Sequence, residues 1–317
     1  TVRAVSTPRR TVQVCGTPFG VKMFSDGALI VAFSDRYTAL GSENPAKAAG
    51  LRLGDWIVSA GGRPVRSNDD LTAAIQAADG ASLTVVYRRD GVQHTAALTP
   101  AQYEKGRYKA GVWVRDSGAG IGTMSFVDAQ HGTFAGLGHS ISDTDTGTEL
   151  TLLSGEIVPV TITGCIRGAA GSPGELRGEF SAKAVGQVLA NDAAGVYGSY
   201  TGGTIGQAVP VANVQEVTPG EAELWTTVQG TTAQPYKVRI ERVTMTGSDP
   251  NRNLLIKVTD ERLLEKTGGI VQGMSGSPIV QNGQLAAVLT HVLVNDPAKG
   301  YAIFAATMLE KADAVIK

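Results

Sequence analysis

The chain has 317 residues, of which 28 are basic and 29 acidic, and this net charge of −1 excludes the electrostatic footprint of a nucleic-acid-binding protein. Glycine is abundant (40 residues) and aromatic residues make up only 6%, which favours short strands and tight turns over a helical bundle. No apolar run reaches the length of a membrane-spanning helix. Two cysteines, Cys15 and Cys165, are too few for a disulfide framework and lack metal-ligand spacing. We therefore expect no metal and no other cofactor.

Residues 1–16 form a polar N-terminal segment with some preference for β-structure. This pattern is typical of either a loose tail or an edge strand that pairs with a later domain. Because the chain starts at Thr1 without an initiator Met, we expect a processed form that has lost an N-terminal membrane anchor.

Residues 17–100 are predicted to form an α+β domain. The Asp26-Gly27 turn separates two strand patterns. A short helix over 45–50 has Asn44 as its N-cap, and a longer helix over 68–78 has acidic residues in its first turn. Strands are predicted at Phe19–Phe24, Ala28–Phe33, Leu53–Ala60 and Leu83–Tyr87.

The run Asn-Pro-Ala-x-x-Ala-Gly-Leu-x-x-Gly-Asp-x-Ile at 44–57 resembles the PDZ domains of bacterial proteases. Such domains bind extended peptides, often the C-terminal end of a partner. The bound peptide pairs as an added strand beside the longer helix of the domain. The resemblance implies carboxylate-receiving amides at Phe19, Gly20 and Val21, and a groove helix that presents Leu71 and Ile75. The alternative is a purely structural module whose groove is closed.

Residues 101–317 read as about a dozen short strands separated by glycine-rich turns. Few helices interrupt them, apart from one predicted at Ala306–Ile316. The pattern indicates an all-β domain, either a sandwich or a pair of barrels.

The stretch Gly273-Met274-Ser275-Gly276-Ser277-Pro278 is the strongest candidate for chemistry. It resembles the Gly-Asp-Ser-Gly-Gly-Pro nucleophile loop of chymotrypsin-like serine peptidases. Flanking glycines allow a turn that exposes the Ser275 hydroxyl and directs the amides of Gly273 and Ser275 at one point, as an oxyanion hole requires. The alternative is a glycine- and serine-rich hairpin loop that has no catalytic role.

A serine nucleophile needs a base, and the chain has four histidines. His94 and His131 lie in a strand and a turn remote from the motif, and His291 follows the strand after Ser275 and is expected to be its neighbour. His139 ends a glycine-rich strand, and its position before Ser275 in the chain matches the His-before-Ser order of chymotrypsin-like enzymes. His139 is therefore the leading base. Spacing alone leaves Asp260, Asp143 and Asp145 open as the group that orients it.

The whole chain resembles the stage IV sporulation protein B serine peptidases of endospore-forming bacteria. The match is carried by Phe-x-x-x-Gly-His-Ser-Ile at 134–141, Gly-Ser-Pro-Gly-Glu-Leu at 171–176, the motif at 273–278, and Thr-His-Val-Leu-Val-Asn-Asp-Pro at 290–297. The resemblance implies a mainly β fold: a PDZ domain at 17–100, then a chymotrypsin-like double β-barrel peptidase domain at 101–317. It also implies Ser275 as nucleophile, His139 as base and Asp260 as third member.

The same resemblance implies a biological role. Such peptidases are exported into the space between the two forespore membranes. There they cleave themselves and a membrane-embedded regulator, which starts sigma-factor processing. The partners would be protein substrates and peptide termini at the PDZ groove. The second hypothesis is a catalytically silent, PDZ-containing, peptide-binding regulator.

Overall fold

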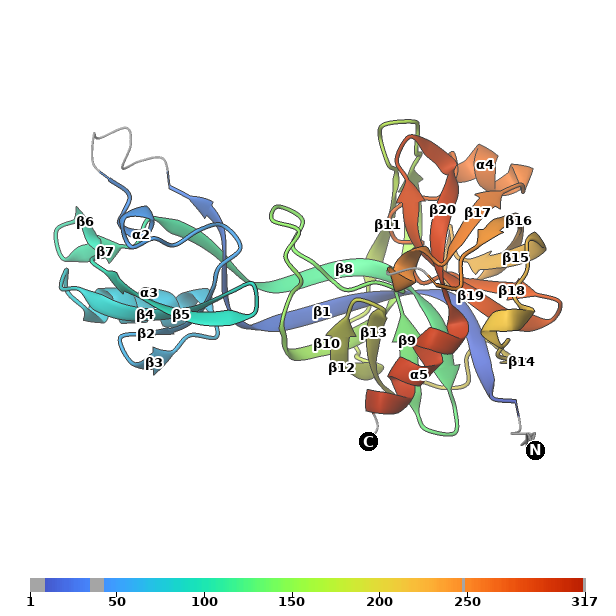
Figure 1. Cartoon of the computed structure of the whole chain (residues 1–317), viewed down its shortest axis with the longest axis horizontal. Coiled ribbons are helices and arrows are strands. Elements are labelled where there is room, and N and C mark those ends of the chain that lie inside the picture. Colours follow the sequence, from blue (N-terminus) through green and yellow to red (C-terminus); the bar gives the residue numbers. More distant parts are fainter. Residues whose placement is uncertain (1–8, 35–42, 247–248, 316–317) are drawn as a thin grey trace. The chain divides into compact units, whose positions relative to one another are not determined.

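The computed structural model describes residues 9–34, 43–246 and 249–315 (Figure 1). The chain divides into two compact units. The barrel unit comprises residues 1–22, 119–141 and 155–317, and the α+β unit comprises residues 23–118 and 142–154. Both boundaries differ from the predicted ones near residues 17 and 100, because three long strands have residues in both units: β1 (Thr11–Phe33), β8 (Val112–Asp128) and β10 (Leu152–Ile166).

The α+β unit contains a sheet in the order β1-β2-β4-β5, and β3 pairs with β2. Asn44 caps the first helix by accepting hydrogen bonds from the amides of Ala46 and Lys47, as predicted. Ser67 caps the second helix through the amide of Asp70. The remaining bounds are β2 (Trp56–Ala60), β3 (Arg63–Pro64), β4 (Leu83–Arg89), β5 (Val92–Leu98), the hairpin β6 (Ala101–Glu104) and β7 (Arg107–Lys109), α2 (Pro45–Ala48) and α3 (Asn68–Ala77).

The first barrel follows the strand order β10-β12-β13-β9-β8-β1. A further pairing between β10 and β1 closes this order on itself, while β11 extends it beside β10 and β14 pairs with β1. The pairing of Thr11–Val14 with β14 confirms the edge-strand interpretation for this part of the N-terminal segment; residues 1–8 lie outside the described residues. The other bounds are β9 (Thr133–Gly136), β11 (Glu175–Phe180), β12 (Gly186–Asp192), β13 (Gly195–Tyr200) and β14 (Gln207–Pro210).

The second barrel is closed in the order β15-β16-β17-β20-β19-β18 (Figure 1). The predicted Asn282-Gly283 turn joins β18 to β19, and both residues have positive φ angles (51° and 73°). The bounds are β15 (Gly220–Thr226), β16 (Gln234–Val243), β17 (Leu254–Val258), β18 (Pro278–Gln281), β19 (Gln284–Leu293), β20 (Asp296–Phe304), and the short helices η1 (Val214–Glu216) and η2 (Pro250–Arg252).

Two α-helices belong to the barrel unit, α4 (Glu261–Thr267) and α5 (Ala305–Val315). Helix α5 packs its buried Met308, Leu309 and Ala312 into a core shared with β9 and β13. It matches the predicted helix at 306–316, of which Ile316 lies outside the described residues. Among the described helices, none is long and apolar enough to cross a membrane.

Candidate active site

The Ser275 loop connects α4 to β18 and has a backbone that only glycine adopts readily at two positions. Gly273 has φ +94° and Gly276 has φ +97°. At Gly276 a β-carbon would lie 1.9 Å from the carbonyl oxygen of Thr123, so the neighbouring backbone also excludes a side chain. Met274 is fully buried in the core of the second barrel, where the chymotrypsin-like motif has an acid. The loop therefore has the required nucleophile turn, but with an apolar anchor.

Ser277, which replaces the second glycine after the serine of the chymotrypsin-like motif, also has a structural role. Ser277 is fully buried; its hydroxyl donates to the carbonyl of Met274 at 2.6 Å and can accept from the Thr226 hydroxyl, whose Oγ1 lies 2.9 Å away. These bonds close the loop on itself at the start of β18. Ser277 is thus a structural serine, which leaves Ser275 as the half-buried one.

Two amides of the loop are available for an oxyanion. Within the described residues, the backbone N–H groups of Gly273 and Ser275 donate to no acceptor. The carbonyls of the same two residues are held by Thr123, whose Oγ1 donates to Gly273 at 2.8 Å and whose N–H donates to Ser275 at 2.9 Å. With the carbonyls fixed, the free amides keep a set direction, which is the arrangement that stabilises a tetrahedral intermediate.

The Ser275 hydroxyl is held by main chain. Its Oγ donates to the carbonyl of Thr290 in β19 at 2.7 Å. The next residue, His291, packs its ring against that of His139, with ring centroids 4.8 Å apart. In the described part of the chain, no hydrogen bond joins Ser275 Oγ to His139, so the serine and the predicted base are close through Thr290 and His291 and are not directly bonded.

His139 follows two residues with left-handed backbone, Leu137 (φ +67°) and Gly138 (φ +71°). A positive φ at a leucine is strained and is typical of functional sites. The amide of Leu137 donates to the carbonyl of Thr123 at 3.4 Å, so this segment and the Ser275 loop are attached to the same residue of β8. The structure thereby brings the two predicted catalytic residues to one place.

The ring of His139 is oriented by a carbonyl. Its Nδ1 lies 2.8 Å from the carbonyl oxygen of Ser140, which can only accept a hydrogen bond. We therefore assign the proton to Nδ1, which leaves Nε2 with the lone pair that a general base needs. Burial of the ring lowers the pKa of His139 below its ordinary value.

Asp260 does not orient His139, and this prediction is contradicted. Its carboxylate caps α4 through the amide of Arg262, accepts from the amide of Lys237, and binds the guanidinium of Arg262 at 2.9 Å. The hydrogen bonds from Arg262 lower the pKa of Asp260 to about 2. Sequence spacing showed that an acid lies near the loop, but not that a neighbouring arginine already binds it.

The two alternative acids, Asp143 and Asp145, also bind other partners. Asp143 is buried and accepts from Thr146 at 2.8 Å (amide) and 2.9 Å (hydroxyl), and it forms an ion pair with Arg115. Asp145 is exposed and binds the same guanidinium at 2.8 Å. Both belong to a turn of the α+β unit. Within the described residues, no carboxylate therefore bonds to His139.

We expect Asp260→Asn to keep kcat within about threefold, because asparagine is an equally good helix cap. An orienting acid of a triad would instead lose about 10⁴-fold on the same change. The ion pair stabilises the fold above the ordinary aspartate pKa near 4 and is lost as pH falls toward about 2, so the stability difference from wild type should shrink over that range. Kinetics at neutral pH and urea unfolding at several pH values test this, and a 10³-fold loss of kcat at unchanged stability would refute it.

The predicted PDZ carboxylate site is also wrong. Phe19, Gly20 and Val21 lie in β1 and belong to the barrel unit. Phe19 is buried edge-to-face against Phe134 (5.9 Å between ring centroids), and a β-carbon at Gly20 would lie 2.3 Å from the ring of Phe180. Backbone inside a packed barrel cannot receive a peptide carboxylate.

Leu71 and Ile75 of α3 point into the core of the α+β unit and are 3% and 6% exposed. They are packing residues in this structure. Beside α3, the amide of Asn68 donates to the carboxylate of Asp116 in β8 at 2.7 Å, and Val112 and Val114 of the same strand pack on this core. The helix also contacts β2 and β7, where Gln76 bonds to Tyr108, whereas residues 19–22 of the predicted 19–24 strand belong to the barrel unit.

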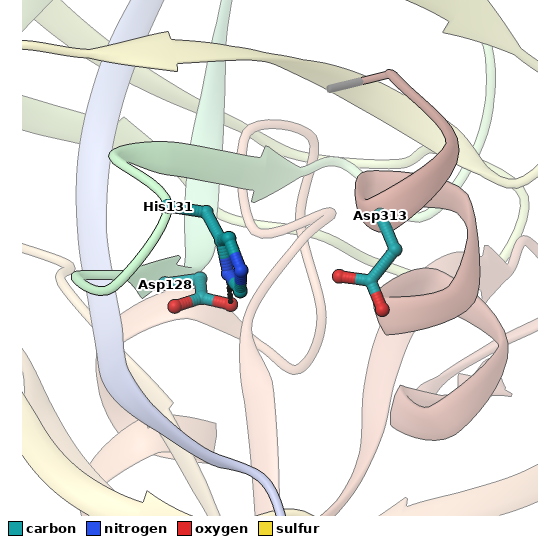
Figure 2. Close-up of side chains that lie close together, drawn as sticks. All are labelled: Asp128, His131 and Asp313. Atoms are coloured by element: carbon teal, nitrogen blue, oxygen red, sulfur yellow. Dashed lines mark hydrogen bonds and ion pairs between the residues drawn. The ribbon is translucent and has the colours of Figure 1, made fainter. Parts of the chain in front are cut away.

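The remaining histidines are outside the site. His94 stacks on Tyr87, with ring centroids 5.4 Å apart. His131 belongs to a cluster with Asp128 and Asp313, whose possible ligand atoms lie within 4.8 Å of one another (Figure 2). Arg10, which directly precedes β1, donates hydrogen bonds to both carboxylates of this cluster, and these bonds raise the pKa of Arg10. The guanidinium supplies the positive charge there, so we interpret the cluster as ion pairs that join Arg10 to Asp128 of β8 and Asp313 of α5.

The low pKa of the base sets an expectation for pH dependence. Burial lowers the pKa of His139, and burial together with the neighbouring His139 lowers that of His291 to about 4. We expect the acid limb of the kcat/KM profile to lie below the ordinary histidine pKa of about 6.5. His94→Gln, which changes an exposed histidine, should leave the limb in place. A limb at or above pH 7 would contradict the buried, neutral base.

Sequence reasoning missed Thr123 and Thr290 altogether and treated His291 only as a neighbour. Thr123 acts through its hydroxyl and its main chain, Thr290 through its carbonyl and His291 through ring packing, and none of these contacts leaves a motif at its own position. The single signal was the run Thr290–Pro297 in the family resemblance.

Comparisons with known proteins bear on the family and the domain layout. The family model of SpoIVB peptidase S55 matches residues 106–309, and a PDZ domain model matches residues 36–89. A protein of Neisseria meningitidis serogroup A, named as a zinc metalloprotease, is 32% identical over 100 residues. That match covers 30% of this chain, and the chain spans only 22% of that relative's length.

Solved structures give weaker likenesses. The PDZ domain of the SdrC-like protein from Listeria monocytogenes covers 28% of this chain and 87% of its own, at 20% identity and a TM-score of 0.24. The Rv3671c protease of M. tuberculosis in its active form covers 63% and 74%, at 16% identity and a TM-score of 0.38. The HtrA-type protease AlgW with a decapeptide covers 64% and 54%, at 11% identity and a TM-score of 0.37.

The predictions of a mainly β chain, an N-terminal PDZ domain and a serine peptidase are confirmed. The family model spans more than half of the chain and includes the Ser275 loop and His139. The chain belongs to the SpoIVB peptidase S55 family.

Proposed function

We propose that this protein is a self-processing serine endopeptidase, with Ser275 as nucleophile and His139 as general base. The observation that carries the proposal is the Ser275 loop, in which two amides without acceptors flank a half-buried serine. Nε2 of His139 takes the proton of Ser275 Oγ as that oxygen attacks the scissile carbonyl. The developing oxyanion accepts from the amides of Gly273 and Ser275, and the imidazolium then protonates the leaving amine.

This mechanism uses a main-chain orienting group in place of a carboxylate. The Ser140 carbonyl accepts a hydrogen bond from Nδ1–H of His139, and the ring of His291 packs against the ring of His139. To act, the Ser275 hydroxyl exchanges its hydrogen bond from the Thr290 carbonyl to His139. A bound substrate that engages β19 would favour this exchange.

We further propose the biological role that the family resemblance implies. The exported enzyme cleaves itself and a membrane-embedded regulator in the space between the forespore membranes, and this cleavage triggers sigma-factor processing. The PDZ domain binds extended peptide termini, as such domains do. The family membership supports this role.

A catalytically silent regulator is the second candidate, and one observation favours it. Ser275 Oγ is bonded to the carbonyl of Thr290, which cannot accept a proton from it for chemistry. A site fixed in this state would be latent, and the protein would act only by binding peptides.

A time course of intact mass and N-terminal sequence distinguishes the two candidates. We expect a longer precursor to shorten at discrete positions, and its Ser275→Ala form to stay intact. Ser172→Ala, which removes an exposed serine from a turn, is the matched control and should be processed normally. A precursor that neither shortens nor reacts at Ser275 with a fluorophosphonate would establish the silent regulator instead.

A further inference from the structure

Thr123 connects both halves of the site. It lies in β8, is 1% exposed, and uses all three of its polar groups at the site. Its Oγ1 donates to the Gly273 carbonyl, its N–H donates to the Ser275 carbonyl, and its own carbonyl accepts from Leu137. These contacts join the Ser275 loop to the segment that carries His139.

Of these three hydrogen bonds, only the one from Oγ1 depends on the side chain at position 123. The two N–H bonds of this network belong to the backbone and are open to any residue at position 123. Only Oγ1 holds the Gly273 carbonyl, at 2.8 Å. Gly273 has φ +94° and no β-carbon, so the peptide that follows it is held by this bond and by the Met274 N–H, which donates to the Val271 carbonyl at 3.1 Å.

We propose that Thr123 is a positioning residue that sets the oxyanion hole through its hydroxyl. Its Oγ1 fixes the Gly273 carbonyl, and its backbone N–H fixes the Ser275 carbonyl. The Ser275 amide lies between these two carbonyls, and the Gly273 amide belongs to the residue whose carbonyl Oγ1 holds, so both donors are kept directed at the reacting carbonyl. This inference rests on the proposed endopeptidase function.

The inference predicts a specific kinetic pattern. A donor that is misdirected in the transition state lowers kcat and leaves substrate binding almost unchanged. Loss of one oxyanion donor costs about 10²–10³-fold, and we expect Thr123→Val, which loosens both donors, to lower kcat by about 10- to 100-fold with KM within about threefold. Thr123→Ser restores a hydroxyl and should recover most of kcat.

Thr227→Val is the matched control. Thr227 is 2% exposed, and its Oγ1 also donates to a main-chain carbonyl, that of Gly16, at 3.0 Å. It makes the same kind of buried bond, but to a carbonyl of β1 and not to the Ser275 loop. A merely structural role of Thr123 would lower the melting temperature of both valine variants equally and leave kcat equal.

Hydrogen exchange of the segment 271–277 adds a measurement that does not depend on activity. We expect faster exchange there in Thr123→Val than in Thr227→Val, because the loop loses its side-chain anchor. Wild-type kcat in a folded Thr123→Val protein would overturn the inference and leave the proposed function intact. If the wild-type protein itself neither cleaves nor labels, the proposed function fails, and unchanged exchange of 271–277 in Thr123→Val would then overturn the inference separately.

Discussion

Ser275→Ala is expected to lower kcat/KM for peptide hydrolysis by about 10⁴-fold or more and to leave the melting temperature within about 2 °C of wild type. The Ser275 side chain makes one hydrogen bond, to the Thr290 carbonyl, so its loss removes little packing. Under the proposed function, the chemistry depends on this hydroxyl entirely. Steady-state hydrolysis of a peptide substrate and thermal unfolding measure both quantities.

Ser277→Ala gives the opposite pattern and serves as the control. Its buried hydroxyl bonds to Met274 and Thr226, so its removal costs about 1–3 kcal/mol of stability. We expect measurable turnover to remain in the folded fraction. Activity that survives in Ser275→Ala would refute the assignment of the nucleophile.

Gly276→Ala is expected to destabilise the protein by about 3–5 kcal/mol, the range of severe point mutations. A β-carbon there would lie 1.9 Å from the Thr123 carbonyl oxygen and 2.6 Å from the Leu137 amide nitrogen, both backbone atoms that cannot move aside cheaply. The φ of +97° adds strain for any residue other than glycine. Urea unfolding gives the free energy of unfolding directly.

The matched control is Gly283→Ala in the β18–β19 turn. Gly283 also has a positive φ (+73°), but a β-carbon there would meet nothing within 4 Å. Only the left-handed backbone is then strained, at a cost of about 1–2 kcal/mol. Equal losses in the two variants would show that the contact with Thr123 is not as close as the structure has it.

Local signals in the sequence predicted those parts of the fold that depend on neighbouring residues. The Asn44 cap and the Asn282-Gly283 turn are encoded within a few residues, and both are present. The sequence predicts two strands, Phe19–Phe24 and Ala28–Phe33, separated by a turn at Asp26-Gly27. The structure instead has one continuous strand, β1, that includes all of these residues. Pairing partners decide whether such a segment turns, and those partners are distant in the chain.

The site divides in the same way. The glycine turns beside Ser275 and His139 were predictable because local backbone geometry requires glycine there. The group that orients His139 was not predictable, because the role of a carboxylate depends on its partners in the folded chain, and Asp260 binds Arg262. Thr123 acts through a bond that spans 150 residues and leaves no periodicity or motif.

The pairing of β1 with β14 has a consequence for how the protein is made. Thr11 is opposite Pro210 and Val14 is opposite Gln207, so this end of the first strand meets its partner only after about 200 further residues have been synthesised. Until then its backbone is an unpaired edge that can associate with other chains. Folding of this part of the sheet is therefore expected to be slow, and it completes only after residues 207–210 have been synthesised.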